Sequence, residues 1–186
     1  MKNLPDVVLL GTSQLELVAG DITQEPLEAI ANAANQQLAG GGGVDGAIHR
    51  AAGPALLQEL KSRYPQGCPT GSAVLTGAGQ LRAQYVLHAV GPRYSGKATD
   101  CEALASAYRT VLNLCLEQNI KTVAFPSIST GVYGYPLEEA APLALRTVAD
   151  FLKEHPEITL VRFVLFDEKT LQAYRTALTA LEKEAA

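Results

Sequence analysis

Seven short stretches of the chain are rich in β-branched and aliphatic residues, and each has the length of a β-strand. In the last stretch, every position from 160 to 166 is apolar except Arg162. An almost continuously apolar strand is typical of a sheet that is covered on both faces, so we expect helices on both sides of it. The expected strands are residues 7–10, 15–19, 29–33, 73–76, 85–90, 122–125 and 159–166.

Apolar residues recur at helical spacing in three longer stretches. The first covers residues 104–115 and the second covers residues 137–152. The third covers residues 171–181 and follows Asp167, a residue type that caps helix N-termini. Two shorter helices are expected at residues 44–52 and 54–63. Strands and helices thus alternate, which predicts a three-layer α/β/α domain. The first stretch has apolar residues at i, i+4, i+7, i+8 and i+11, namely Leu104, Tyr108, Val111, Leu112 and Cys115.

The size and composition of the chain are those of a globular protein. Its 186 residues suffice for one domain with a sizeable core, so we expect a single domain over residues 1–186. Hydrophobic residues make up 47% and charged residues 18%, which excludes a disordered chain. The net charge of −4 lacks the basic surplus that drives binding to a phosphate backbone, so bulk nucleic-acid binding is not expected. Residues 64–72 and 94–100 are expected to be surface loops.

The cysteines and the N-terminal region indicate in which cellular compartment the protein is expected. Cys68, Cys101 and Cys115 form neither a CxxC pair nor an even-numbered disulfide framework, which suits a reducing compartment, and we expect them to be ordinary buried thiols. The apolar run at residues 7–10 is too short for a signal peptide or a membrane span. We therefore expect a soluble cytoplasmic protein with no membrane partner.

An unusual segment begins at Asn32-Ala-Ala-Asn35 and continues with four glycines at residues 40–43, just before an expected helix. Glycines let the main chain approach a ligand closely, and the free N–H groups and dipole of a helix N-terminus favour an anion. The pattern indicates a phosphate cradle, with a flexible surface loop as the alternative.

The spacing of Gly41, Gly43 and Gly46 also satisfies G-x-G-x-x-G, so an NAD(H)-dependent oxidoreductase with a Rossmann fold is a further alternative. In that fold the motif follows its strand directly, whereas here the polar residues 35–37 intervene. No acidic residue ends a second strand at the usual distance. The segment also lacks the Gly-Lys-Ser/Thr ending of a P-loop, which argues against hydrolysis of nucleoside triphosphates.

A second glycine-bearing loop, at residues 126–134, lies between an expected strand and an expected helix. Two such loops at the carboxyl ends of strands in one sheet can hold a diphosphate from both sides. Neither loop contains Lys or Arg. We therefore expect backbone N–H groups and the hydroxyls of Ser127, Ser129 and Thr130 to bind the anion.

Four segments together resemble the macrodomain family, and specifically the MacroD-type ADP-ribose-binding hydrolases that include bacterial O-acetyl-ADP-ribose deacetylases. The resemblance extends from about residue 15 to 166, in the order found in the family. It implies a single macrodomain over residues 1–186, with a three-layer α/β/α fold around a mixed central sheet. The four segments are residues 20–23, 32–35, 41–53 and 126–135.

The resemblance also implies roles for individual residues. Asp21 accepts a hydrogen bond from the adenine amino group, and Phe166 packs on the adenine ring. Asn32 and Asn35 face the distal ribose, and Tyr133 closes over it. Without the resemblance, Asp21 and the asparagines would be turn residues and Phe166 a core residue. Further ligand-binding positions are Ile22, Gly41, Gly42, Gly43, Val44, Gly131 and Val132.

Asp45 is the residue that we expect to carry the chemistry. It lies in the first turn of the helix after the glycines, where the helix dipole also stabilises a carboxylate for purely structural reasons. Asp45 would activate or position the attacking water, or orient the ribose, while Asn32 and Asn35 fix the sugar. His49 lies one turn later on the same face and either orients Asp45 or hydrogen-bonds in the core.

The expected reaction is metal-independent hydrolysis of an ester on the distal ribose. The ester is either the acetyl ester of free ADP-ribose or the Asp or Glu ester that links ADP-ribose to a protein. A module that binds ADP-ribose or ADP-ribosylated proteins without turnover is the alternative. No His, Cys and Asp cluster has zinc spacing, so no metal or other cofactor is expected. His88 is expected to be a core histidine, His155 to lie at a helix end, and Arg93 and Tyr94 to lie at the edge of the pocket.

Overall fold

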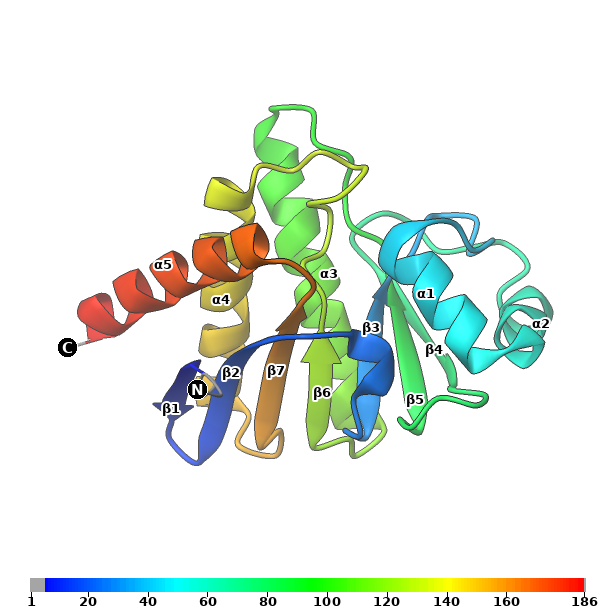
Figure 1. Cartoon of the computed structure of the whole chain (residues 1–186), viewed down its shortest axis with the longest axis horizontal. Helices are drawn as coiled ribbons and strands as arrows, with labels where there is room; N and C mark the ends of the chain where they lie inside the picture. Colours follow the sequence, from blue (N-terminus) through cyan, green and yellow to red (C-terminus); the bar gives the residue numbers. More distant parts are fainter. Residues whose placement is uncertain (1–5, 186) are drawn as a thin grey trace.

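A seven-stranded sheet forms the centre of the computed structural model, which describes residues 6–185 (Figure 1). Its strands follow the order β1-β2-β7-β6-β3-β5-β4. Strands β2, β7, β6, β3 and β5 run parallel, whereas the edge strands β1 and β4 run antiparallel to their neighbours, so the sheet is mixed. The strands are β1 (Asp6–Leu10), β2 (Ser13–Ala19), β3 (Ala29–Ala33), β4 (Ala73–Gly77), β5 (Tyr85–Ala89), β6 (Thr122–Phe125) and β7 (Leu160–Leu165).

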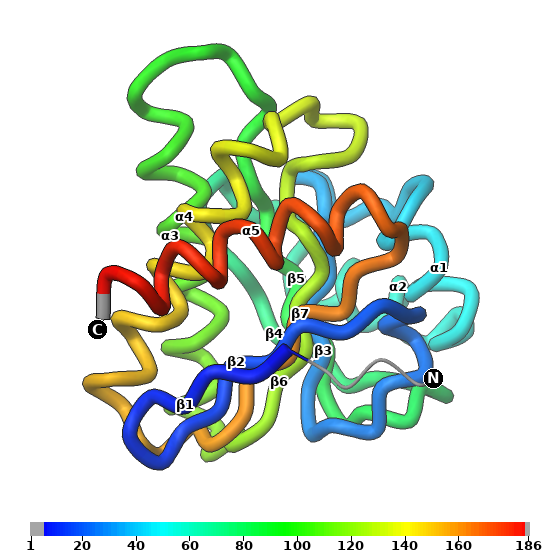
Figure 2. Tube along the Cα trace, turned by 60° about the vertical axis from the view of Figure 1, so that its left-hand side comes forward, coloured from blue at the N-terminus to red at the C-terminus, as the bar shows by residue number. Residues whose placement is uncertain are grey.

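Helices cover both faces of the sheet. Val123 of β6 packs with helices α3, α4 and α5 in one core cluster, whereas its neighbour Ala124 packs with α1 and α2 in another. Successive residues of a strand point to opposite faces, so the two clusters lie on opposite sides of the sheet. In Figure 2, α1 and α2 lie on the right of the molecule and α3 and α4 on the left. The helices are α1 (Gly43–Ala52), α2 (Pro54–Arg63), α3 (Ala98–Glu117), α4 (Leu137–Glu154) and α5 (Glu168–Ala185), with a 3-10 turn, η1 (Ile22–Gln24).

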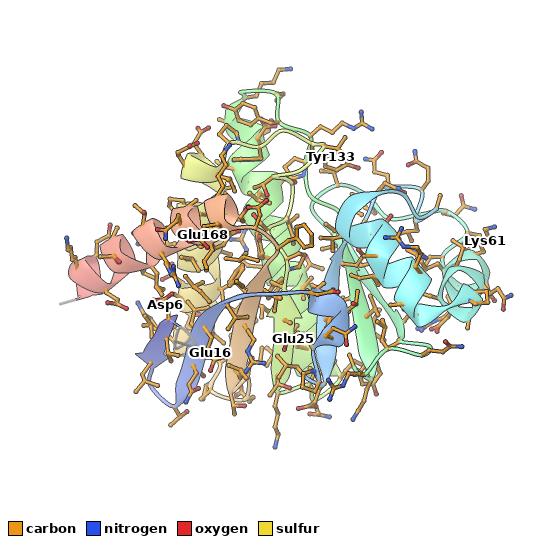
Figure 3. All side chains as sticks on the ribbon, in the orientation of Figure 1. Asp6, Glu16, Glu25, Lys61, Tyr133 and Glu168 are labelled. Atoms are coloured by element: carbon orange, nitrogen blue, oxygen red, sulfur yellow. The ribbon has the colours of Figure 1, made fainter. Side chains whose placement is uncertain are left out.

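Arg162, the polar position in the last strand, is matched by two carboxylates. Its Nε donates to Glu16 Oε2 at 2.8 Å, and its Nη1 donates to Glu25 Oε2 at 2.7 Å. Figure 3 labels both glutamates, one on β2 and one just after η1. Because the three partly buried charges satisfy one another, a polar residue fits into an otherwise apolar strand.

The expected strands and helices are all present, with differences at some ends. Helix α3 begins at Ala98, inside the stretch that was expected to be a loop. The physical reason is Asp100, whose carboxylate accepts the N–H groups of Ser95 and Gly96 and so organises the first turn. At the other end of the chain, Asp167 Oδ1 accepts the N–H of Thr170 at 2.8 Å, as expected for the cap of α5. This hydrogen bond lowers the pKa of the Asp167 carboxyl.

The expectation of three buried thiols was wrong for one of them. Cys68 and Cys115 are buried, and burial raises the pKa of the Cys115 thiol to about 12. Cys101 is exposed because it lies on the outer side of the first turn of α3. Within residues 6–185, no helix is both long and apolar enough to cross a membrane.

Candidate active site

A cleft of about 310 Å³ opens at the carboxyl ends of the neighbouring parallel strands β6, β3 and β5. Sheets of this kind bind ligands at this edge, where loops from adjacent strands face each other. One wall is glycine loop 1 (residues 34–42, after β3), and the opposite wall is glycine loop 2 (residues 126–136, after β6). Of the expected ligand-binding residues, the cleft is lined by Asn35, Gly41, Gly42, Gly43, Val44, Asp45, Ser127, Ser129, Gly131, Val132 and Tyr133.

Asp45 lies in the first turn of α1, where two side chains hold it. Asn32 Nδ2 donates to Asp45 Oδ1 at 2.7 Å, and His49 Nε2 lies 3.3 Å from the same oxygen. Asp45 is only 7% exposed, and Asn32 is fully buried. This contact is the one that the interpretation of His49 as a residue that orients Asp45 requires.

Asn32 is oriented in turn by His88, its register partner on the neighbouring strand β5. The hydroxyl of Thr76 donates to the carbonyl of Gly77 at 2.8 Å, so it accepts the Nε2–H of His88 at 2.9 Å. His88 Nδ1 is therefore an acceptor and takes the second amide hydrogen of Asn32 at 3.2 Å. Three hydrogen bonds thus link Thr76, His88, Asn32 and Asp45 in a buried series.

His88 is a fully buried histidine, as expected, but it also belongs to the site. Burial lowers its pKa to about 3, and the charge of His49 adds a smaller effect in the same direction. The ring is therefore neutral at physiological pH and keeps Nδ1 as an acceptor for Asn32. The expectation for His88 missed this role because the contact joins two strands that are far apart in the sequence.

The two carboxylate oxygens of Asp45 have different surroundings. Oδ1 is held by Asn32 and His49, whereas Oδ2 forms no hydrogen bond with the residues that the structure describes. Oδ2 faces Gly41, since a Cβ built on Gly41 would lie 3.3 Å from this oxygen and 3.8 Å from Asn35 Nδ2. Gly41 and Asn35 both line the cleft, so Oδ2 is the oxygen that can bind a water or a hydroxyl there.

Asn35 folds glycine loop 1 back on itself. Its Nδ2 donates to the carbonyl of Gly40 at 2.9 Å, and its Oδ1 accepts the N–H of Ala39 at 3.2 Å. Asn35 is therefore a turn former that also lines the cleft. This whole loop separates β3 from α1, so the G-x-G-x-x-G match does not directly follow a strand. The structural context that a Rossmann motif requires is therefore missing at this position.

The N-terminus of α1 has no capping side chain. Its first amides have no partner within the helix, and a helix end of this kind favours an anion. A side chain at Gly42 or Gly43 would meet open space, whereas a Cβ on Gly46 would lie 2.4 Å from the carbonyl oxygen of Gly41. Gly46 thus lets α1 approach glycine loop 1, while Gly42 and Gly43 leave the amides accessible from the cleft.

Glycine loop 2 is fixed by aromatic residues of the core. The Tyr108 hydroxyl of α3 accepts the N–H of Ile128 at 3.1 Å, and the Tyr174 hydroxyl of α5 donates to Ser127 Oγ at 3.0 Å. Thr130 Oγ1 donates to the same Ser127 oxygen at 2.8 Å. The Thr130 hydroxyl thus forms a hydrogen bond within the loop, and Thr130 is not among the residues that line the cleft.

Two buried polar atoms in the described part of the chain have no hydrogen-bond partner, namely Asn32 Oδ1 and Ser129 Oγ. A buried polar atom without a partner costs free energy. Ser129 has a left-handed backbone conformation (φ +68°), and a Cβ on Gly91 would lie 2.2 Å from its hydroxyl oxygen. A glycine at position 91 is therefore required for this loop to pack against the end of β5.

Arg93 brings to the cleft a positive charge that neither glycine loop contains. Its guanidinium carbon lies 5.2 Å from the centre of the Tyr133 ring, and the N–H of Tyr94 donates to the carbonyl of Tyr133 at 2.8 Å. Figure 3 labels Tyr133 on the side of the molecule where α1 begins. Arg93 forms no ion pair with the described carboxylates. The sequence placed Arg93 at the pocket edge but gave it no role.

The residues expected at the adenine lie at the ends of β2 and β7. Asp21 accepts the N–H and the hydroxyl of Thr23 at 2.9 and 2.7 Å and so caps η1, which is its expected structural role. Ile22 is buried in the core cluster that includes residues of α1 and α2. Phe166 is 84% exposed directly after β7, so the alternative that it is a core residue was wrong. Its ring is free to stack on a ligand.

Comparison with known proteins agrees with this geometry. The family model described as Macro domain matches residues 31–144, more than half of the chain. A Macro domain-containing protein of Caldanaerobacter subterraneus is 54% identical over 91% of this chain and 98% of its own length. An O-acetyl-ADP-ribose deacetylase of Salmonella newport is 52% identical over 90% of this chain and 96% of its own. This chain belongs to the macrodomain family.

Solved macrodomains share the whole fold of this one. The Oceanobacillus iheyensis macrodomain with ADP has a TM-score of 0.92 and 42% identity, and the match covers 97% of this chain and 98% of that one. The Trypanosoma brucei macrodomain in complex with ADP-ribose has a TM-score of 0.83 and 42% identity over 88% and 68% of the two chains. In the described part of this macrodomain, no three His, Cys, Asp or Glu side chains are placed to hold a metal ion together.

Proposed function

We propose that this macrodomain hydrolyses esters on the distal ribose of ADP-ribose without a metal or other cofactor. Its substrates are O-acetyl-ADP-ribose and proteins that carry mono-ADP-ribose on Asp or Glu. Relatives that are named O-acetyl-ADP-ribose deacetylases, such as the one at 52% identity, support the reaction class. The observation that carries the proposal is the Asp45 carboxylate, which has one oxygen fixed by Asn32 and the other free at the cleft.

The site accounts for the binding of ADP-ribose in three parts. Adenine stacks on Phe166 and donates its amino group to Asp21, beside Ile22. The diphosphate lies between the uncapped N-terminus of α1 and glycine loop 2, where backbone N–H groups meet it. The distal ribose lies against Asn35 and Tyr133, next to Asp45 Oδ2.

The chemistry follows from the two oxygens of Asp45. Asn32 donates to Oδ1 and His49 Nε2 lies 3.3 Å from it, so the hydrogen bond to Oδ1 directs Oδ2 into the cleft. A water bound to Oδ2 adds its oxygen to the carbonyl carbon of the ester and gives a proton to the carboxylate. The ester C–O bond then breaks, and the ribose oxygen takes a proton as it leaves. The products are a carboxylic acid and ADP-ribose.

The test is incubation of the wild-type protein with O-acetyl-ADP-ribose, and separately with a Glu-ADP-ribosylated protein, in the presence of EDTA. Release of ADP-ribose is followed by chromatography, and binding of ADP-ribose by calorimetry. We expect turnover of both esters in EDTA. A protein that binds ADP-ribose but hydrolyses neither ester is a binding module, and that result would refute the proposal. NADH fluorescence on titration tests the oxidoreductase alternative, for which we expect no change.

A further inference from the structure

We infer that a second cavity, next to the cleft, is an acceptor subsite for the polypeptide on either side of an ADP-ribosylated Asp or Glu. The inference rests on the proposed function, because it concerns the group that is esterified to the distal ribose. The cavity has a volume of about 450 Å³. It shares Gly91, Arg93 and Tyr133 with the cleft, so the two spaces adjoin at these residues, which we call the common wall.

The common wall lies at the end of the cleft where the reaction takes place. Gln36 and Gln37, which line the cavity, directly follow Asn35, and Tyr133 lines both spaces. Asn35 and Tyr133 are the residues assigned to the distal ribose. The adenine end, at the ends of β2 and β7, contributes no residue to the cavity. A group esterified to the distal ribose is therefore directed toward this cavity.

The size of the cavity distinguishes between the two proposed substrates. Its volume falls in the range of about 300–1,000 Å³ that is typical of sites for drug-sized ligands. The acetyl group of O-acetyl-ADP-ribose has only two carbons and fills a small part of such a space. A modified side chain together with its neighbouring residues fills much more of it. The cavity is thus needed for the protein ester and not for the metabolite.

Polar groups line part of the cavity, and hydrogen bonds join two of the loops that form it. The amide of Gln36 donates to the hydroxyl of Thr70 at 2.8 Å, and the backbone carbonyl of Gln36 accepts the N–H of Cys68 at 2.8 Å, which joins two loops. The amide of Gln37, the hydroxyl of Thr99 and the backbone of these loops offer donors and acceptors to a bound main chain. Such groups recognise a peptide without demanding one sequence.

Two side chains of opposite charge, Arg93 and Asp100, line the cavity. Asp100 lines it, but its carboxylate is occupied by the backbone and hydroxyl groups of Ser95 and by the N–H of Gly96. These hydrogen bonds lower the pKa of the Asp100 carboxyl. Arg93 has no carboxylate partner among the described residues and is the cation on the wall. Arg93 is therefore the group on this wall that can pair with an acidic residue next to the modified side chain.

The test compares two substrates in variants that obstruct the cavity. Thr99 is exposed in the first turn of α3, so Thr99→Tyr places a ring in the cavity, and Gln37→Glu adds a negative charge. Thr176→Tyr, at an exposed position on α5, is the matched control. We measure kcat/KM for a Glu-ADP-ribosylated protein and for O-acetyl-ADP-ribose, with thermal unfolding as the check on folding.

We expect Thr99→Tyr and Gln37→Glu to lower kcat/KM about tenfold for the modified protein and less than about twofold for O-acetyl-ADP-ribose. Thr176→Tyr should change neither value. Equal losses on both substrates, or no loss on the protein, would overturn the acceptor subsite. If the wild type hydrolyses O-acetyl-ADP-ribose but not the protein ester, the subsite is refuted while the deacetylase activity stands. If it hydrolyses neither, the proposed function itself has failed.

Discussion

The side-chain amide of Asn32, on strand β3, donates to Oδ1 of Asp45, on helix α1, at 2.7 Å. This hydrogen bond joins the interior of the sheet to the cleft, because Asn32 is fully buried while Asp45 lines the cleft. The other amide hydrogen of Asn32 is held by His88. The position of the carboxylate is thus set from within the sheet, and substrate has little to rearrange.

Replacement of Asn32 should affect both catalysis and stability. Asn32→Ala frees Asp45 Oδ1 and leaves His88 Nδ1 without its donor, so we expect kcat on O-acetyl-ADP-ribose to fall at least about tenfold. The free energy of unfolding should fall by about 1–3 kcal/mol, since a buried acceptor loses its partner. Steady-state kinetics and urea unfolding check both values. Asn113→Ala, at an exposed position on α3, is the control and should change neither.

His88 should act as a positioning residue through Asn32. His88→Leu removes the acceptor for the Asn32 amide, so we expect kcat to fall while the Kd for ADP-ribose changes little. His88→Gln retains a side-chain acceptor and should recover part of kcat. A merely structural role predicts instead that kcat follows the loss of stability in both variants, with no rescue by glutamine. Kinetics, calorimetry of ADP-ribose binding and urea unfolding separate the two cases.

The buried neutral state of His88 should also appear in the pH dependence of stability. Its pKa is about 3 in the folded protein and about 6.5 when unperturbed, so the unfolded state binds more protons between these values. Stability therefore falls as the pH decreases from 6.5 toward 3. His49 and Asp45, the nearest titratable groups, are present in both wild type and His88→Gln, and their contribution largely cancels in the difference. Urea unfolding at pH 7, 5.5 and 4.5 should show a shallower slope for His88→Gln; identical slopes would contradict this assignment.

Phe166 should contribute to binding and hardly at all to folding. Its ring is 84% exposed, so Phe166→Ala removes little core packing, and the melting temperature should stay within about one degree. Loss of base stacking costs about 1–3 kcal/mol, so the Kd for ADP-ribose should rise by a factor of roughly 5 to 150. Leu9→Ala, at an exposed apolar position on β1, is the control. An unchanged Kd for Phe166→Ala would contradict the assignment of the adenine to a position on the Phe166 ring.

Local patterns in the sequence predicted most of the fold. Strand and helix positions follow from apolar periodicity, and Asp167 indicated the start of α5 through ordinary capping chemistry. The start of α3 was missed because Asp100 forms its hydrogen bonds backward into the preceding loop, which periodicity does not register. The exposure of Cys101 depends on which side of that helix turn faces the core.

The site was predictable in part, through the two glycine loops and the family resemblance. Helical spacing alone predicted that Asp45 and His49 lie on the same face of a helix. In the structure, His49 Nε2 lies 3.3 Å from Asp45 Oδ1. The contact between Asn32 and His88 depends on the register of β3 against β5, which no local pattern contains. The same is true of Arg93, which reaches the Tyr133 ring only because the segments after β5 and β6 lie side by side in the fold.

The most direct test of the account is the activity of Asp45→Asn on O-acetyl-ADP-ribose. Asparagine keeps the shape of the side chain and an oxygen for Asn32, but it cannot accept a proton from water. We predict that kcat falls by about 10²–10⁴-fold while the Kd for ADP-ribose changes less than about threefold. A variant that keeps kcat within a few-fold of the wild type, with ADP-ribose bound as before, would contradict the role of Asp45 in the reaction.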